Sequence, residues 1–307
     1  ILFLGCTWFV QAQLTTVEDF GANPGQLRLH LHIPDTYDNT ENMPLVVALH
    51  GCSQSIENMA EQSGWNTLAD HYNFIVLYPE QRTMNNWSKC FNWFRQKDID
   101  STHGELASIR QMITYVTQHY NIDTNRIYTY GLSAGAVMSA TLLATFPHLF
   151  EAGAVFAGAP YKVADNVFQG MKVLVNTPDR NPSEWKAKLP YPDIKPPGLF
   201  VYHGQKDNVV DIKNAHELIE QWSAWNEIEA QPSSITTPFD GHQGIIRYDY
   251  KNETGDTAIV FLELKNVGHE LAVDPGQGEK QGGATGPYAT DINFFSTYYV
   301  ALFFNLL

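Results

Sequence analysis

The chain has 307 residues, of which 44% are hydrophobic, 17% charged and 13% aromatic. This composition is typical of a globular fold and excludes collagen-like, coiled-coil and disordered proteins. Asp and Glu number 33 against 19 Lys and Arg, which gives a formal net charge of -14. Because an acidic protein repels phosphate backbones and anionic lipid headgroups, we expect neither a nucleic acid nor a membrane surface as its partner.

The start of the chain has the pattern of an export signal. Residues 1–10 (ILFLGCTWFV) form an uncharged apolar block, followed by Gln11-Ala12-Gln13. This pattern predicts a signal-peptide remnant over residues 1–12, whose Met and basic start would precede the numbered chain, and a secreted or periplasmic location. A buried first strand and a lipoprotein signal with Cys6 as the lipidated residue are the alternatives. Beyond this block no apolar run reaches the length of a membrane span, so we expect none.

Cleavage after Ala12 would leave two cysteines, Cys52 and Cys90. An even count in an oxidising compartment favours a disulfide between them, with two free buried thiols as the alternative. Neither cysteine has a second Cys or a His at ligand spacing, so we expect no metal site there.

Strands and helices are expected to alternate along the chain. Residues 27–33 (LRLHLHI) predict a half-exposed strand, and the apolar runs at 45–49 and 74–77 predict strands covered on both faces. Further strands are expected at residues 126–130, 152–156, 199–202 and 258–264, and helices at residues 58–71, 105–120, 133–145 and 209–225. This order predicts an α/β fold in a single domain, with a mostly parallel, doubly wound sheet.

Two stretches interrupt this alternation. Residues 178–198 contain six prolines around Trp185, and we expect an irregular segment that caps a site. Residues 268–287 are rich in Gly and Pro and are expected to form a second long loop. No internal repeat is visible.

A G-x-S-x-G sequence, Gly131-Leu132-Ser133-Ala134-Gly135, follows a predicted strand and begins a small-residue helix. This context is the one that a nucleophile elbow requires, because the turn is so tight that the neighbours of the serine must be small. The turn would place the Ser133 hydroxyl at a helix N-terminus. A simple helix N-cap is the alternative role for Ser133, and the two correct flanks favour the nucleophile.

A nucleophilic serine needs a base, and the base needs an orienting carboxylate, in the chain order Ser, Asp, His for this kind of fold. Asp207 follows the predicted strand 199–202 by a short turn, which places it at the carboxyl end of a strand, where ligands gather. Asp211 is the competitor, one helical turn later. We therefore select Asp207 as the orienting acid.

Position also decides among the histidines. His269 follows the last predicted strand and a short turn, whereas its rival His242 precedes that strand among turn residues. His50 and His203 also lie at strand ends, where we expect buried structural histidines. His269 is therefore the candidate base.

The acyl-transfer intermediate would need two N–H donors for its oxyanion. The residue after the nucleophile supplies one, the backbone N–H of Ala134. The other should come from the loop after an earlier strand, where Gly51 permits a sharp turn and the backbone N–H of Cys52 is the candidate. A disulfide at Cys52 would hold that donor still.

Six segments in this order resemble the secreted polyhydroxybutyrate depolymerase and feruloyl or acetylxylan esterase group of α/β hydrolases: HGCSQ (50–54), LYPEQ (77–81), CFNWF (90–94), GLSAG (131–135), GAPY (158–161) and GH (268–269). The resemblance implies an α/β-hydrolase catalytic domain over residues 13–307, with Ser133, Asp207 and His269 as its triad. It also supports the Cys52–Cys90 pairing and the donors at Cys52 and Ala134. One departure is Ala136, where such enzymes often have a second Gly after the motif.

The resemblance implies a serine esterase without a cofactor. Its substrate would be a feruloyl or acetyl ester of plant polysaccharide, or a polyhydroxybutyrate-type polyester oligomer. No polymer-binding module is recognisable before Leu307, so we expect soluble or oligomeric esters. Trp93 and Trp185 are expected to line the substrate pocket, and Trp222 and Trp225 to lie in the core. A peptidase on the same fold and a catalytically inactive binding module are the alternative functions.

Overall fold

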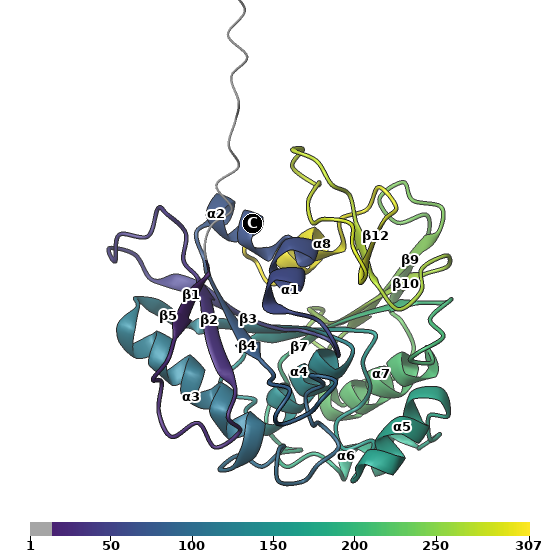
Figure 1. Ribbon diagram of the computed structural model, residues 1–307. Coiled ribbons are helices and arrows are strands. Elements are labelled where there is room, and N and C mark those ends of the chain that lie inside the picture. Colours follow the sequence, from purple (N-terminus) through teal and green to yellow (C-terminus); the bar gives the residue numbers. More distant parts are fainter. Residues whose placement is uncertain (1–13) are drawn as a thin grey trace, which may run out of the picture.

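The apolar runs of the sequence form the middle of a ten-stranded sheet in the computed structural model, which describes residues 14–307 (Figure 1). Six neighbouring strands, β4, β3, β5, β6, β7 and β10, are parallel, and antiparallel strands complete both edges. The predictions for residues 1–12, including the role of Cys6, lie outside the described residues. The α/β-hydrolase architecture predicted from the sequence is confirmed.

The strands of this sheet, in spatial order, are β1 (Thr15–Val17), β2 (Arg28–His32), β4 (Ile75–Glu80), β3 (Met43–Leu49), β5 (Ile122–Leu132), β6 (Ala152–Phe156), β7 (Gly198–Gly204), β10 (Thr257–Leu264), β9 (Ile245–Lys251) and β8 (Ser234–Thr236). A separate pair, β11 (Leu271–Val273) and β12 (Ala289–Asp291), is parallel. Because the six central strands share one direction, their carboxyl ends meet at one edge, where ligand sites form in open α/β sheets.

Helices cover both faces of the sheet (Figure 1). One face carries α1 (Ile56–Ser63), α2 (Trp65–Tyr72) and α8 (Ser296–Phe303), and the other carries α3 (Gly104–His119), α4 (Ala134–Thr145) and α7 (Lys213–Asn226). The short helices α5 (Val167–Val175) and α6 (Pro182–Lys186) lie on the same side as α7. Within residues 14–307, no helix is both long and apolar enough to cross a bilayer.

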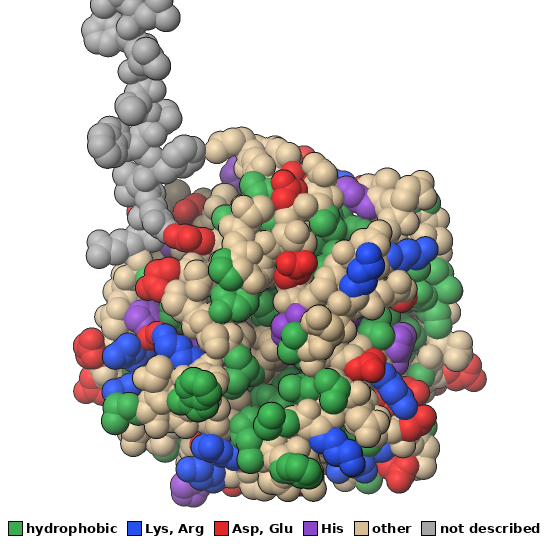
Figure 2. All heavy atoms as spheres, turned by 45° about the vertical axis from the view of Figure 1, so that its right-hand side comes forward, with side chains coloured by type: hydrophobic (Ala, Val, Ile, Leu, Met, Phe, Trp, Pro, Cys, Tyr) green, Lys and Arg blue, Asp and Glu red, His purple; other side chains and the backbone are tan. Residues whose placement is uncertain are grey.

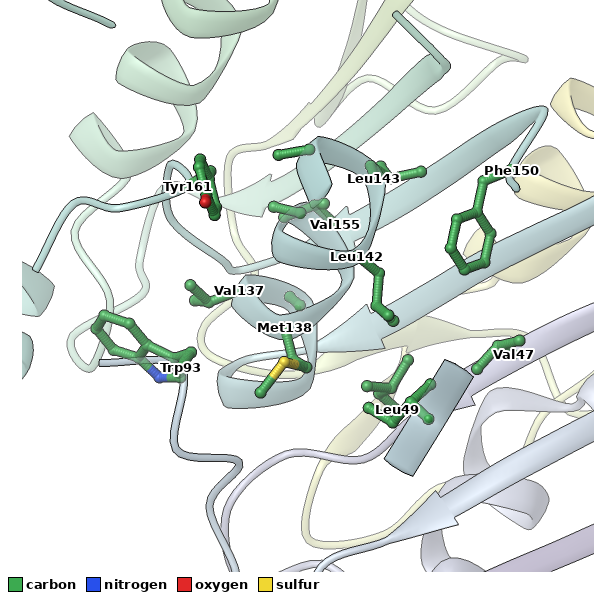
Figure 3. Close-up of a cluster of buried hydrophobic side chains, with 14 of the residues drawn as sticks. Val47, Leu49, Trp93, Val137, Met138, Leu142, Leu143, Phe150, Val155 and Tyr161 are labelled. Atoms are coloured by element: carbon green, nitrogen blue, oxygen red, sulfur yellow. The ribbon is translucent and has the colours of Figure 1, made fainter. Parts of the chain in front are cut away.

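Alternate residues of the buried strands supply two separate cores. In β3, Leu45, Val47 and Leu49 belong to the cluster under α3, α4 and α7, whereas Val46 and Ala48 belong to the cluster on the opposite face. Figure 3 shows part of the first cluster, in which Val47 and Leu49 of β3 lie near Met138 and Leu142 of α4. Burial on both faces explains why these strands are continuously apolar in sequence.

Three sequence predictions need correction. The single helix expected over residues 58–71 is two helices, because Gly64 has a positive φ of 72° and ends α1 before α2 begins. Residues 178–198 contain α6, which packs against α7, and none of these residues lines the cavity that contains Ser133. Residues 268–287 contain β11, so they are not simply a loop.

Gly135 is required by the close approach of β3 to the start of α4. A Cβ atom at this position would lie 2.4 Å from the Leu49 carbonyl oxygen and 2.5 Å from that of His50. Backbone cannot move aside cheaply, so we expect Gly135→Ala to lower the free energy of unfolding by about 3 kcal/mol or more. Denaturant unfolding measures this change. Gly244→Ala is the control, since nothing lies within 4 Å of its Cβ position, and an equal loss in both variants would contradict the argument.

Candidate active site

The turn that carries Ser133 is strained and tightly packed. Ser133 follows β5 directly and precedes α4, with φ 57° and ψ -121°. A Cβ atom on Gly131 would lie 2.3 Å from the Gly135 carbonyl oxygen, so both glycines of the motif are needed for the turn to close. A positive φ at a non-glycine residue is costly and persists where the surrounding structure fixes it. This strand–turn–helix geometry is the one that the predicted nucleophile elbow requires.

Asp207 and His269 meet at the same edge of the sheet. His269 Nδ1 lies 2.7 Å from Asp207 Oδ2, and the other carboxylate oxygen accepts the N–H groups of Val209 at 2.9 Å and Val210 at 2.8 Å. His203 Nε2 is 3.4 Å from Asp207 Oδ2. Burial alone would raise the pKa of Asp207, but the hydrogen bonds from His203 and His269 outweigh it and hold that pKa well below its usual range. The carboxylate is therefore a fixed anion beside the His269 ring.

The rival side chains lie in other settings. Asp211 is exposed and accepts the N–H of Lys213 at the start of α7, as expected for a surface residue. The His242 ring packs edge-on against Phe294, with the ring centres 5.2 Å apart. His203 is buried and donates from Nε2 to the Val210 carbonyl at 2.8 Å, so it is a structural histidine as predicted. The sequence did not reveal that it also contacts Asp207.

The loop after β3 lies beside Ser133. A Cβ atom on Gly51 would lie 3.4 Å from that of Ser133, which shows how close the backbone of this loop comes. The structure joins Cys52 to Cys90 by a disulfide, which confirms the predicted pairing. The next residue, Ser53, donates its N–H to the Ser88 carbonyl at 2.7 Å. Two links therefore hold the β3 loop to the segment around residue 90.

His50 is buried at the base of this loop. Its Nδ1–H donates to the Gly51 carbonyl at 2.7 Å, and its Nε2 accepts the N–H of Gln81 at 3.0 Å. Both contacts fit the neutral ring, and burial lowers the pKa of His50 to about 4. His50 is therefore the structural histidine that the sequence predicted, and it ties the β3 loop to the end of β4.

A buried carboxylate organises the neighbouring segment and was not found from the sequence. Glu105, in the first turn of α3, accepts the Asn92 N–H at 2.7 Å and the Gln81 side-chain amide at 2.6 Å, and it also contacts the side-chain amide of Asn92. Burial raises the pKa of Glu105 to about 7, although these hydrogen bonds act to lower it. The same Gln81 amide donates to the Cys90 carbonyl at 3.2 Å. Glu105 thus anchors the segment that carries the second disulfide cysteine.

A cavity of about 600 Å³ opens at Ser133. Besides Ser133, its lining includes Cys52, Ala134, Trp93, Phe94, Val137, Met171, Leu174 and Val210. Trp93, which the sequence placed in the substrate pocket, lines this cavity; it packs edge-on against Phe94 and lies near Val137 of α4 (Figure 3). A larger cavity of about 760 Å³ lies at the amino ends of β6 and β7 and includes none of these residues.

Trp185 is not at this cavity, which corrects the prediction that it lines the pocket. Trp185 belongs to α6 and its side chain is fully buried. Its Nε1–H donates to Glu217 at 2.8 Å, and the Arg180 guanidinium lies over its ring. The prediction followed from the cap expected over residues 178–198, but α6 in that segment packs against α7. Trp222 and Trp225 are buried in the core, as predicted.

The sheet, the elbow and the Asp207–His269 pair define an α/β hydrolase. Comparison with known proteins gives the family: the family described as "Esterase PHB depolymerase" matches residues 27–233, and the chain belongs to it. Poly(3-hydroxyalkanoate) depolymerase C of Paucimonas lemoignei is 37% identical over 96% of this chain and 70% of its own length. Feruloyl esterase B of Talaromyces stipitatus is 29% identical over 86% of this chain and 74% of its own length.

A solved structure supports the fold. An acetyl xylan esterase from Aspergillus awamori superimposes with a TM-score of 0.75 at 23% identity, covering 84% of this chain and 94% of its own. These relatives are carboxylic ester hydrolases by name, and this chain is accordingly a carboxylic ester hydrolase. The family resemblance predicted from the sequence motifs is confirmed.

The protonation of His50 should make the protein acid-sensitive. The pKa of His50 in the folded protein, about 4, lies below the 6.5 of an ordinary histidine, so the unfolded chain binds the proton more readily. The stabilisation is therefore complete above pH 6.5 and is lost as the pH falls towards 4. We expect the difference in unfolding free energy between wild type and His50→Gln to shrink by about 3 kcal/mol between pH 7 and pH 4. Parallel pH curves for the two proteins would contradict this assignment.

Proposed function

We propose that the protein is a secreted serine esterase that works through an acyl-enzyme. The observation that carries this proposal is the 2.7 Å contact between His269 Nδ1 and Asp207 Oδ2, at the same sheet edge as the strained turn of Ser133. A base fixed by a buried carboxylate, at the same sheet edge as a serine at the start of a helix, fits the arrangement that acyl transfer needs. The family relationship supports the same chemistry.

In this proposal the reaction has two halves. His269 takes the proton of Ser133 while the oxygen attacks the ester carbonyl, and Asp207 stabilises the imidazolium that forms. The protonated His269 then gives its proton to the leaving alcohol, which leaves the acyl group on Ser133. A water molecule, activated by His269 in turn, releases the acid and restores the serine.

The oxyanion of each intermediate would lie against two backbone N–H groups. Ala134 is the first residue of α4, so its N–H is one of the unpaired donors at that helix N-terminus. The Cys52 N–H is the proposed second donor. Support comes from the cavity, which Cys52, Ser133 and Ala134 line together, and from the disulfide, which holds Cys52 in place. Donors fixed before the reaction stabilise the developing charge without reorganisation.

The proposed substrates are those that the relatives' names suggest: feruloyl or acetyl esters of plant polysaccharide, or polyhydroxybutyrate-type polyester oligomers. Secretion is proposed from the signal-like residues 1–12 together with the disulfide, which is typical of proteins outside the cytoplasm. The peptidase and inactive-module alternatives are disfavoured, because the relatives are esterases by name and Ser133, Asp207 and His269 are all present.

The nucleophile is tested by comparing the protein with its Ser133→Ala variant. Methyl ferulate, acetylated xylan and a hydroxybutyrate oligomer are offered side by side, and release of acid is measured. We expect wild type to release acid from at least one of them and Ser133→Ala to lose this activity by at least about 1,000-fold. A fluorophosphonate should label Ser133 in the folded wild type. Absence of both release and labelling would favour the inactive binding module.

The orienting acid is tested by a matched pair of variants. Asp207→Asn keeps the shape of the side chain but favours the wrong His269 tautomer, so we expect kcat to fall by about 1,000-fold or more. Asp211→Asn is the control, because Asp211 is exposed and contacts the start of α7. Steady-state kinetics on the best of the three esters measures both. A large loss in Asp211→Asn alone would overturn the choice of acid.

A further inference from the structure

A buried amide beside Ser133 takes no direct part in the proposed reaction. Gln54 belongs to the HGCSQ segment, lies two residues before α1 and has a fully buried side chain. Its Oε1 accepts the N–H of Gly51 at 2.5 Å. A Cβ atom on Gly51 would lie 3.1 Å from this oxygen and 3.4 Å from the Cβ atom of Ser133. The Gln54 amide therefore lies close to the candidate nucleophile.

The contact with Gly51 fixes the orientation of the Gln54 amide. The reverse orientation would direct the amide N–H groups at the Gly51 N–H, donor against donor. Within residues 14–307, the Nε2 atom of Gln54 is buried and has no hydrogen-bond partner. A buried donor without a partner is costly, and an apolar side chain of the same size would avoid that cost. We conclude that the amide oxygen is the part of Gln54 on which the loop depends.

The loop after β3 leaves one backbone N–H group free. Besides the N–H of Gly51, that of Ser53 donates to the Ser88 carbonyl at 2.7 Å, and that of Gln54 donates to the Gly51 carbonyl at 3.4 Å. The N–H of Cys52, between them, has no acceptor among the described residues. Because Cys52 lines the cavity at the nucleophile, this free donor lies where an oxyanion would form.

The Gly51 carbonyl determines the direction of the free donor. This carbonyl and the Cys52 N–H belong to one trans peptide, so they point in opposite directions. The carbonyl accepts His50 Nδ1–H at 2.7 Å as well as the Gln54 N–H. A rotation of the peptide would break both bonds. It would also replace the N–H by a carbonyl oxygen at the place where negative charge develops.

Glycine at position 51 makes such a rotation easy unless a neighbour prevents it. The close approach of this loop to Ser133 favours glycine, which adopts many backbone conformations at little steric cost. Gln54 supplies the missing restraint through two contacts with this one residue. Its side-chain oxygen holds the Gly51 N–H, and its backbone N–H holds the Gly51 carbonyl.

The charge of the protein gives little help to an oxyanion. The net charge is -14, and on the face shown in Figure 2 the Lys and Arg side chains are interspersed with Asp and Glu. Among the described residues that line the cavity, Arg95 alone is charged, and its guanidinium lies over the Phe94 ring. A negative charge at Ser133 therefore depends mainly on nearby N–H donors, which are most effective when they are fixed before the reaction.

We propose that Gln54 is a positioning residue for the oxyanion, which fixes the Gly51–Cys52 peptide so that the Cys52 N–H stays directed at the carbonyl oxygen of an ester bound at Ser133. This inference rests on the proposed acyl-enzyme mechanism. Gln54 acts through Gly51, because its side chain is buried and does not line the cavity. Contact with the substrate oxygen is left to the N–H groups of Cys52 and Ala134.

The variant Gln54→Met tests this role, because methionine has a similar length and shape but no amide. Gln62→Met is the matched control. Gln62 is also buried and its Oε1 accepts a backbone N–H, that of Tyr288, at 3.1 Å, but it does not line the cavity at Ser133. Steady-state kinetics use the ester that wild type hydrolyses best. Inhibition is measured with a trifluoromethyl ketone of the same acyl group, to which a nucleophilic serine adds to give a tetrahedral oxyanion.

We expect Gln54→Met to lower kcat by about tenfold or more and to change KM by less than about threefold, because the donor acts mainly in the transition state. Its inhibition constant for the ketone should rise by about the factor by which kcat falls. Gln62→Met should keep kcat within about twofold of wild type, even where its thermal unfolding midpoint falls as far as that of Gln54→Met.

Wild-type kcat and ketone affinity in a folded Gln54→Met protein would overturn the proposal, and so would equal losses of kcat in the two glutamine variants. If Gln54→Met does not fold, Gln54→Asn replaces it, since asparagine keeps the amide but withdraws it from Gly51 by one methylene group, and the same outcomes decide. Failure of the proposed function is recognised separately, as an absence of Ser133-dependent release from every ester, which would leave Gln54 no oxyanion donor to position.

Discussion

The close approach of the β3 backbone to the start of α4 is the constraint on which the site depends. Gly135 permits this approach, and Gly131 permits the reversal from β5 into α4. Together they bring Ser133, at a positive φ, next to the loop that holds Gly51 and Cys52. A larger residue at either glycine would separate the serine from its proposed oxyanion donors. The sheet around this point is buried on both faces, so its packing can hold the strained turn in place.

Buried polar groups near the site hold in place the loops that lie outside the sheet. His50 and Glu105 both contact Gln81, one through its backbone N–H and the other through its side-chain amide. The same amide reaches the Cys90 carbonyl, and the disulfide continues the connection to Cys52. Neither buried group has an opposite charge as a partner in this network. Their pKa values move in opposite directions, that of His50 down and that of Glu105 up, because burial disfavours the charged form of each.

Chain order and strand ends led to the choice of Ser133, Asp207 and His269 as triad candidates. A parallel sheet brings the carboxyl ends of its strands together, so residues just after β5, β7 and β10 were expected to meet, and His269 does contact Asp207. The bounds of short buried strands such as β6 were predicted to within a residue or two, because a strand that is buried on both faces is continuously apolar in sequence. The positions of Trp185 and Glu105 could not be predicted, since each depends on how one helix packs against distant segments. No local pattern in VFQGMKVLV shows which of its apolar residues would face solvent in α5.

The proposed triad and the cavity at Ser133 place different demands on a substrate. The proposed triad would act on the carbonyl group alone, so it could not by itself choose among a feruloyl, an acetyl and a hydroxybutyrate ester. Selection must come from contacts remote from the reacting bond, whose binding energy holds the ester in position. The lining of the cavity at Ser133 is largely apolar and includes Trp93, Phe94 and Met171, so such contacts are available beside the serine.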